Sequence, residues 1–138
     1  MLRTLSIAVL TASFAVPALA GPAQERLLDT YRAQAQQAEP GFGGFSADRG
    51  RAFYLAPHTE GQPNMSACAS CHTPDPTQAG RHVKTGREIE PMAVHGTPDR
   101  FTDLSKVERR FSRDCLNVLG RECTAREKGD FILFLTTR

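Results

Sequence analysis

The middle of this chain, from His58 to about Pro98, limits most strongly what the chain can fold into. This stretch is rich in proline, glycine, threonine and charged residues, it has few large apolar side chains, and neither the helical nor the strand period is sustained in it. A loop of about forty residues is uncommon in a compact domain unless something other than regular secondary structure organises it. The sequence therefore predicts an additional organiser for this part of the fold.

Helical patterns flank the irregular middle on both sides. Before the irregular middle, the sequence predicts helices over 22–38 and 47–55. After it, the sequence predicts a helix from about Asp103 to Leu119 and a last helix that begins after Thr124. The chain has no internal repeat and no strand pair with a hairpin signal. Because 138 residues are too few for several domains, we expect a single all-α domain.

Residues at the predicted helix ends support these boundaries. Pro22 stands in the first turn of the first helix, and Ser46 is a plausible N-cap for the second. Gly120 is placed as the residue that ends the third helix, and the sequence from Thr124 to Glu127 has the pattern of a capping box.

Residues 1–20 are typical of a secretory signal peptide. Arg3 supplies a positive charge, residues 5–16 form an apolar run, and Pro-Ala-Leu-Ala ends the segment with the small-x-small pattern that signal peptidase reads. Cleavage after Ala20 leaves a domain of residues 21–138. An uncleaved membrane anchor is the alternative, although the run is short for a span. We expect export, in bacterial terms to the periplasm.

The charge balance argues against a long-range electrostatic function. The 17 basic residues face 15 acidic ones, which gives a formal net charge of +2. A nucleic-acid-binding protein would be expected to carry a clustered basic excess. We therefore expect no nucleic-acid partner and look for the function in a local site.

One motif carries recognisable chemistry, the C-x-x-C-H sequence Cys68-Ala69-Ser70-Cys71-His72. It is the attachment sequence of a c-type haem. Two thiols at this spacing, at the start of a helical turn, can each form a thioether to one edge of the haem, and His72 then lies beneath the ring as the proximal iron ligand. A large flat apolar cofactor also explains the long loop, because irregular chain can wrap it.

Three other interpretations of the motif fit less well. A thioredoxin-type redox pair would need a strand before the motif and a helix after it. A zinc site would need a second ligand pair, and Cys115 and Cys123 do not have that spacing. A disulfide within C-x-x-C is strained and leaves His72 without a role. With a single motif, we expect one haem c per chain.

The surroundings of the motif resemble the class I cytochromes c. Gly50-x-x-Phe53-Tyr54 before the motif, and Gly129, Phe131 and Phe134 in the last helix, look like the crossed N- and C-terminal helices of that class. The resemblance implies a class I cytochrome c-like fold with long haem-wrapping loops. The small Gly50 would let the two helices approach closely.

A narrower resemblance covers nearly the whole mature chain. Three motifs in the same order are similar to the sphaeroides haem protein family: Lys84-Thr85-Gly86-Arg87-Glu88-Ile89, Thr97-Pro98-Asp99-Arg100-Phe101-Thr102-Asp103, and Cys115-x-x-Val118-Leu119-Gly120-Arg121-Glu122-Cys123-Thr124. The resemblance implies a small monohaem cytochrome that can bind oxygen or nitric oxide and that works beside a dihaem cytochrome c and a membrane cytochrome b.

The family also implies a particular residue at the sixth position of the iron. There the ligand is an asparagine immediately before the first of the two later cysteines, and it leaves on reduction. This chain has Asp114 at that position, which is a departure from the family. A carboxylate is an unusual haem ligand, and it would favour ferric iron more strongly than a neutral amide does.

The helical pattern draws attention to Asp114 independently. It interrupts an apolar stripe with 3-4-3-4 spacing, formed by Leu104, Val107, Phe111 and Val118. A carboxylate there is costly unless it is solvated, hydrogen-bonded or bound to a cation. Three roles stay open: a solvated residue at the edge of the stripe, a distal hydrogen-bonding residue, or the sixth ligand.

Met92 and His95, beyond His72 in the chain, are the rival sixth ligands. Met92 is the best candidate for ordinary His–Met ligation, although a methionine in such a segment more often packs than ligates. His58, His82 and His95 stand in polar loop sequence, so we expect all three to be solvated.

Cys115 and Cys123 are the remaining cysteines. They are eight positions apart across a helix end, and in an oxidising compartment they are best interpreted as a disulfide, unless geometry forbids the bond. The alternative is two buried thiols.

Two classes of function follow. The first is a monomeric periplasmic cytochrome that passes single electrons to redox partner proteins and whose sixth position opens to O2 or NO. The second is a haem-dependent enzyme, either a peroxidase or an NO- or O2-reducing subunit. A plain electron carrier with firm His–Met ligation is a third interpretation.

Overall fold

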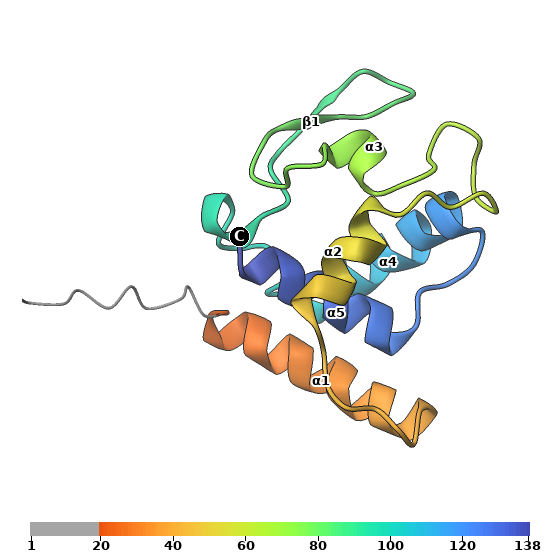
Figure 1. The fold of residues 1–138 in the computed structure, drawn as a ribbon. Helices are drawn as coiled ribbons and strands as arrows, with labels where there is room; N and C mark the ends of the chain where they lie inside the picture. The colour runs from red at the N-terminus through yellow and green to blue at the C-terminus, as the bar shows by residue number, and fades with distance from the viewer. Residues whose placement is uncertain (1–19) are drawn as a thin grey trace, which may run out of the picture.

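The structure is a computed structural model that describes residues 20–138, so the predicted signal peptide lies almost wholly outside the described residues (Figure 1). Within that range no helix is both long and apolar enough to cross a membrane. The fold is all-α with one small hairpin. Its elements are α1 (Pro22–Ala38), α2 (Ala47–Leu55), α3 (Ala69–His72), β1 (Gly80–Arg81), β2 (Glu88–Ile89), the 3-10 turn η1 (Val94–Gly96), α4 (Leu104–Leu119) and α5 (Ala125–Thr136).

The four long helices begin where the sequence predicts, and α1, α2 and α4 also end there. The hydroxyl of Ser46 accepts a 3.2 Å hydrogen bond from the amide of Arg49 at the start of α2. The carboxylate of Asp103 accepts a bond from the amide of Lys106 at the start of α4, and Thr124 forms a complete capping box at the start of α5. Gly120 ends α4 in the left-handed conformation, with a φ of 70°.

The sequence did not predict the hairpin or the short 3-10 turn η1. Strands β1 and β2 pair antiparallel, with Gly80 opposite Ile89 and Arg81 opposite Glu88. Two-residue strands are too short to show an alternating pattern. The connecting turn is closed locally, because the amide of Gly86 donates a 2.8 Å hydrogen bond to the carbonyl of His82.

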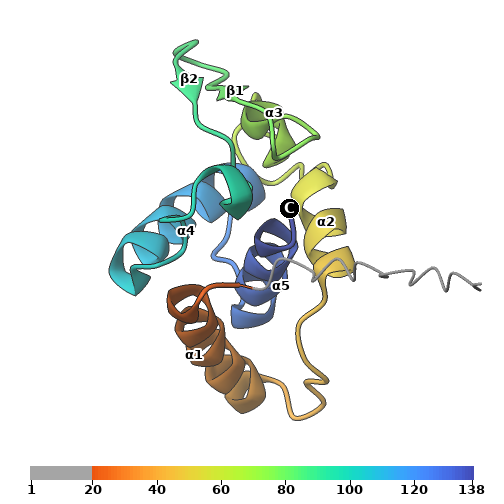
Figure 2. The ribbon, with the colours of Figure 1, turned by 90° about the vertical axis from the view of Figure 1, so that its left-hand side faces the viewer.

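Helix α5 lies at the centre of the fold, with α1, α2 and α4 around it (Figure 2). Its Phe131 packs against four other aromatic rings, with ring centroids 5.6–6.4 Å apart; they belong to Phe53, Tyr54, Phe101 and Phe111. Because these rings come from α2, α4 and the loop before α4, Phe131 joins the three segments into one core.

The helix that crosses α5 most closely is α2 (Figure 1). A Cβ atom at Gly50 would lie only 1.9 Å from the carbonyl oxygen of Asp130, so the contact requires glycine. The crossed pair of the class I resemblance is therefore α2 with α5. The first helix, α1, is a further layer that packs on another side of α5.

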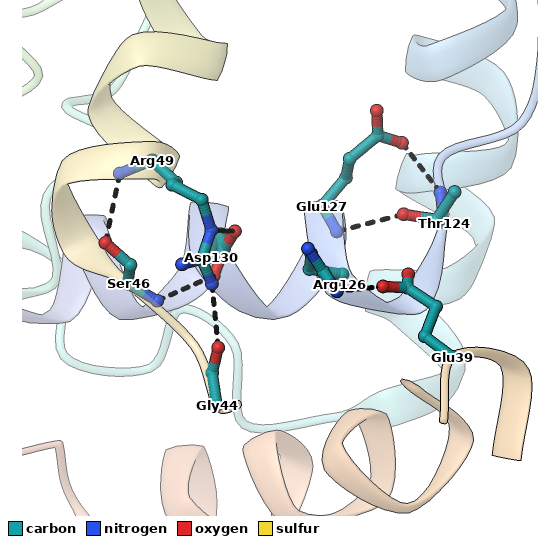
Figure 3. Close-up of polar contacts among 8 residues, drawn as sticks. All are labelled: Glu39, Gly44, Ser46, Arg49, Thr124, Arg126, Glu127 and Asp130. Atoms are coloured by element: carbon teal, nitrogen blue, oxygen red, sulfur yellow. Dashed lines mark hydrogen bonds and ion pairs between the residues drawn. The ribbon is translucent and has the colours of Figure 1, made fainter. Parts of the chain in front are cut away.

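Polar contacts fasten the loop between α1 and α2 to α5 (Figure 3). The buried carboxylate of Asp130 accepts hydrogen bonds from the amide of Ser46 at 2.6 Å and from the guanidinium of Arg49 at 2.8 and 2.9 Å. Arg126, further along the same side of α5, forms an ion pair with Glu39. These donors offset the cost of burying the carboxylate and hold the loop against α5.

Helix α4 is attached to the rest of the core by a second polar cluster. The carboxylate of Glu108 accepts hydrogen bonds from the buried hydroxyl of Tyr31 in α1 and, at 2.9 and 3.1 Å, from the ammonium of Lys128 in α5. These hydrogen bonds hold the pKa of Glu108 below its usual value, although burial acts in the opposite direction. The cluster links three helices.

Candidate haem site

The C-x-x-C-H motif folds as a single helical turn, α3. The backbone amides of Cys71 and His72 donate to the carbonyl of Cys68 at 3.3 and 3.2 Å, which closes the turn. Neither Cys68 nor Cys71 takes part in a disulfide. One turn therefore presents two free thiols and an imidazole, as a covalently attached haem requires.

The turn is held in place by α2 and by the hairpin. The hydroxyl of Tyr54, which is completely buried, donates hydrogen bonds to the carbonyls of His72 at 3.0 Å and Thr73 at 2.6 Å. Gly80 of β1 lies so close that a Cβ there would be 2.1 Å from the carbonyl oxygen of Cys71. Thr73 has a φ of 63°, which turns the chain sharply after the motif.

The imidazole of His72 suits metal ligation. Its Nδ1 atom is buried and has no hydrogen-bond partner. Burial, together with the positive charge of Arg100, lowers the pKa of His72 to about 4, while Asp114 acts in the opposite direction. The imidazole is therefore neutral at physiological pH, which is the form that binds iron.

The thiol of Cys68 lies in an apolar environment, where Cys68 and Ala69 pack against the hydrophobic core. Burial raises the pKa of Cys68 to about 12, and the negative charge of Asp114 contributes to the increase. The thiol is thus uncharged. Together with the unpartnered His72 nitrogen, these residues fit a covalently bound haem.

The negative charge of Asp114 raises the pKa of both Cys68 and His72, which indicates that Asp114 lies on the side of α4 toward the motif. Its side chain is 48% exposed and accepts a 2.7 Å hydrogen bond from Arg113 in an ion pair. Asp114 therefore stands at the edge of the buried side of α4. It is neither fully buried nor without a partner.

The apolar stripe on α4 differs from the predicted one at its start. Leu104 is 40% exposed, because it is the first residue of the helix and lies beyond the packed core, so its assignment to the core was wrong. The residues of α4 that are buried are Val107, Phe111, Cys115, Val118 and Leu119.

The rival sixth ligand Met92 is a core residue in this structure. Met92 and Met65 are both buried in the main hydrophobic cluster. The adjoining amide of Ala93 donates a 2.9 Å hydrogen bond to the carbonyl of Pro76, which fixes the segment across the irregular middle of the chain.

Of the three histidines expected to be solvated, only His95 is exposed. The prediction was wrong for His58, whose Nε2 is buried without a partner and whose ring packs edge-on against Phe53 with centroids 5.6 Å apart. His82 is half-buried, and its Nδ1 accepts bonds from the amides of Lys84 and Thr85 at 3.3 Å. The contacts that withdraw these two histidines from solvent depend on how the loops fold, and the polar sequence around each residue does not predict them.

Cys115 and Cys123 form a disulfide, with Cα atoms 5.7 Å apart. The bond joins the end of α4 to the loop before α5. Its first cysteine, Cys115, directly follows Asp114 in α4. The loop before the motif is fastened to the same end of α4, because Gln62 donates a 2.6 Å hydrogen bond to the side chain of Asn117.

Three residues of this site, Tyr54, Arg100 and Arg110, were not predicted from the sequence. Arg100 is half-buried, its Nη2 donates a 2.8 Å hydrogen bond to the carbonyl of Pro91, and its charge acts on His72. The one sequence feature that could have pointed to Arg100 is its place in the family-like motif over residues 97–103. Arg110 had none, since an arginine on the outside of a helix is ordinary.

A small helical fold built around a single Cys-x-x-Cys-His turn defines a c-type cytochrome with a class I-like fold. The family model "Domain of unknown function (DUF1924)" matches residues 40–135. The cytochrome c-type protein SHP of Cereibacter sphaeroides is 44% identical over 94% of this chain and 96% of its own length. The chain belongs to the DUF1924 family and, with SHP, to the family of small monohaem c-type cytochromes that the sequence resembled; its cofactor is haem c.

Solved structures agree with this assignment. The structure of oxidized SHP, described as an oxygen binding cytochrome c, superposes with a TM-score of 0.74 at 41% identity and covers 81% of this chain and 94% of its own. The solution structure of cytochrome c'' from Methylophilus methylotrophus, which addresses haem-ligand detachment, has a TM-score of 0.73 at 37% identity and covers 83% and 93%. The class I-like all-α fold is thus confirmed.

Proposed function

We propose that this chain is a periplasmic one-electron carrier whose haem is accessible to a small diatomic ligand. Cys68 and Cys71 form the thioethers to the haem and His72 is the proximal iron ligand. The haem, when bound, supplies the one-electron redox step. The buried Nδ1 of His72, which has no partner within the described residues, is the observation that supports this assignment most directly.

The protein around the motif sets the properties of the haem in two ways. Tyr54 fixes the backbone of His72, so that the imidazole is oriented before the metal is bound. Burial keeps the pKa of His72 low, so that no proton competes for the ligand nitrogen. The polypeptide therefore sets both the orientation and the protonation state of the proximal ligand.

A diatomic ligand would bind at the sixth position of the iron, for which Asp114 and Met92 are the candidate protein ligands. Asp114 faces the motif but is half-exposed and already engaged by Arg113, whereas Met92 is held in the core. A ligand residue that has a competing partner and access to water exchanges more readily than a buried methionine. We infer that Asp114 occupies or hydrogen-bonds the sixth side, and that O2 or NO can enter there. That SHP is described as oxygen binding supports this view.

We propose that the chain is exported and that it exchanges electrons with other redox proteins. The signal peptide over residues 1–20 directs the chain to the periplasm, where the Cys115–Cys123 disulfide can persist. Redox proteins there, such as a dihaem cytochrome c and a membrane cytochrome b, are the expected electron partners. The chain acts as a monomer.

Absorption spectra of the purified holoprotein test this function. The ferrous spectrum should change on addition of carbon monoxide, and Met92→Leu should leave both this change and the ferric spectrum as they are. Asp114→Ala should alter the ferric spectrum. A ferrous spectrum that carbon monoxide does not change, together with loss of a methionine charge-transfer band in Met92→Leu, would establish firm His–Met ligation and overturn the proposed open site.

A further inference from the structure

The outward face of α4 carries four basic side chains, Lys106, Arg109, Arg110 and Arg113, and all four residues are exposed. Their spacing of three and four positions places them on one face of the helix, opposite the buried residues. We call this set the α4 basic face. A chain with a net charge of only +2 has no general basic excess, so the grouping is local.

Little within the described residues neutralises this face. Lys106 lies 3.8 Å from the N-cap carboxylate of Asp103, and Arg113 pairs with Asp114. Arg109 bonds only to the hydroxyl of Ser105, and Arg110 has no ion-pair partner in the part of the chain that the structure describes. The remaining carboxylate of α4, Glu108, points to the opposite side and is held by Lys128 and Tyr31. Two uncompensated positive charges therefore remain beside the paired ones.

The α4 basic face borders the haem site. Arg113 forms an ion pair with Asp114 at 2.7 Å, and Arg110 lies one turn before Asp114 on the same helix, so both arginines stand beside the residue proposed for the sixth side of the haem. At the far end of α4, the side chain of Gln62 accepts a hydrogen bond from Lys84 of the hairpin and donates one to Asn117. Lys84 of the hairpin is thus joined through Gln62 to the end of α4.

Exposed apolar side chains adjoin these charges. Leu116, one turn beyond Arg113 on α4, is 51% exposed, and Val83, next to Lys84, is 41% exposed. Small interfaces that combine a few apolar contacts with a charged surround are typical of transient electron-transfer encounters, in which charge provides orientation and rate and binding stays weak.

From these observations we propose that electrons enter and leave this protein through the α4 basic face, and that the partner docked there is a redox protein with an acidic surface around its own cofactor. The proposal rests on the function proposed above and names the face and the chemistry of the partner. Opposite charges on the two faces raise the rate of productive encounter at low ionic strength.

Two redox probes of opposite charge test the proposal on the haem-loaded full chain. Hexacyanoferrate(III) is a trianion and tris(1,10-phenanthroline)cobalt(III) is a trication, and each oxidises the ferrous protein at a rate measured by stopped flow. The double variant Arg109→Glu/Arg110→Glu reverses the two uncompensated charges. Its reduction potential is measured as well, because Arg110 lies near the haem site, and the rates are compared after correction for driving force.

The matched control is Arg26→Glu/Arg32→Glu, which makes the same change in net charge on α1, where Arg26 is exposed and Arg32 is half-buried and pairs with Asp29. Helix α1 lies at the end of the fold opposite α3 and the hairpin in both views (Figures 1 and 2). Unchanged absorption spectra establish that the haem site is intact in both double variants.

We expect Arg109→Glu/Arg110→Glu to slow oxidation by hexacyanoferrate(III) about tenfold at low ionic strength and to accelerate oxidation by the cobalt complex, with both effects vanishing at high salt. The control should change either rate by less than about twofold. Equal effects of the two double variants would overturn the α4 basic face as the docking site while leaving the proposed function intact. A wild-type protein that exchanges electrons with neither probe would instead overturn the proposed function.

Discussion

The buried hydroxyl of Tyr54 donates a 3.0 Å hydrogen bond to the carbonyl oxygen of His72, and thereby joins α2 to the turn that carries the haem-binding residues. The same hydroxyl also donates to Thr73 at 2.6 Å. Because α2 crosses α5 closely at Gly50, this contact connects the motif to the helix pair at the centre of the fold. The position of the imidazole is thus set by the fold.

Tyr54→Phe tests this connection. The change leaves two carbonyls without a buried donor, so we expect a loss of about 1–3 kcal/mol in the free energy of unfolding, measured by urea denaturation. It should also alter the absorption spectrum, because His72 becomes less firmly oriented. Tyr31→Phe, which removes another buried hydroxyl far from the motif, should destabilise the protein with no spectral change. Identical spectra in the two variants would contradict the role of Tyr54.

Gly50→Ala tests the helix crossing. A Cβ at this position would meet the backbone carbonyl of Asp130, which cannot move independently of α5. We expect a loss of about 3 kcal/mol or more in the free energy of unfolding and a lower yield of holoprotein. Gly43→Ala is the control, because a Cβ there meets nothing within 4 Å; its stability should stay within about 1 kcal/mol of wild type. A similar stability for both variants would show that α2 and α5 do not approach closely at Gly50.

The three-helix cluster at Glu108 predicts part of the acid sensitivity. Its hydrogen bonds hold the pKa of Glu108 below the ordinary value of 4.5 against the effect of burial. A group whose pKa is lowered on folding contributes stability above its unfolded pKa, and this contribution is lost as the pH falls through the folded value. The stability of Glu108→Gln should therefore fall less between pH 7 and pH 4 than that of wild type, as measured by urea denaturation at both pH values.

The exposed Glu122 provides the control for that experiment, because its side chain makes no ion pair within residues 20–138. Glu122→Gln should keep the wild-type dependence on pH. If Glu108→Gln and Glu122→Gln lost stability equally on acidification, the cluster would contribute nothing to the acid response.

Removal of the disulfide by Cys115→Ser/Cys123→Ser should affect both stability and the haem environment. The bond closes a short loop, so we expect its loss to lower the free energy of unfolding by about 2–3 kcal/mol, measured by urea denaturation. Because Cys115 adjoins Asp114, the ferric spectrum should also broaden or shift. An unchanged ferric spectrum would mean that the end of α4 does not influence the haem.

The parts of this protein that the sequence predicted are those set by local chemistry. The caps at Ser46, Asp103 and Thr124 and the left-handed Gly120 fix helix ends through contacts only a few residues away, and all are present. Gly50 was also correctly identified as a position of close helix approach. The Cys115–Cys123 pairing followed from compartment and spacing.

The parts that the sequence did not predict depend on contacts between distant segments. The Nε2 atom of His58 is buried only because Phe53 and the loop before the motif lie against the ring, and Leu104 is exposed only because the core ends before it. The hairpin at Gly80 is fixed by the nearby carbonyl of Cys71, not by an alternating pattern. The electrostatic surroundings of His72 likewise come from residues on other segments, Arg100 and Asp114 among them.

The mass of the exported protein tests the central claim most directly. When the full chain is produced in cells that mature c-type cytochromes, we predict a product that begins at Gly21 and is heavier than the polypeptide by one haem. Cys68→Ser/Cys71→Ser should return the bare polypeptide mass. A wild-type product without added haem, or a haem adduct that survives loss of both cysteines, would contradict covalent attachment at this turn.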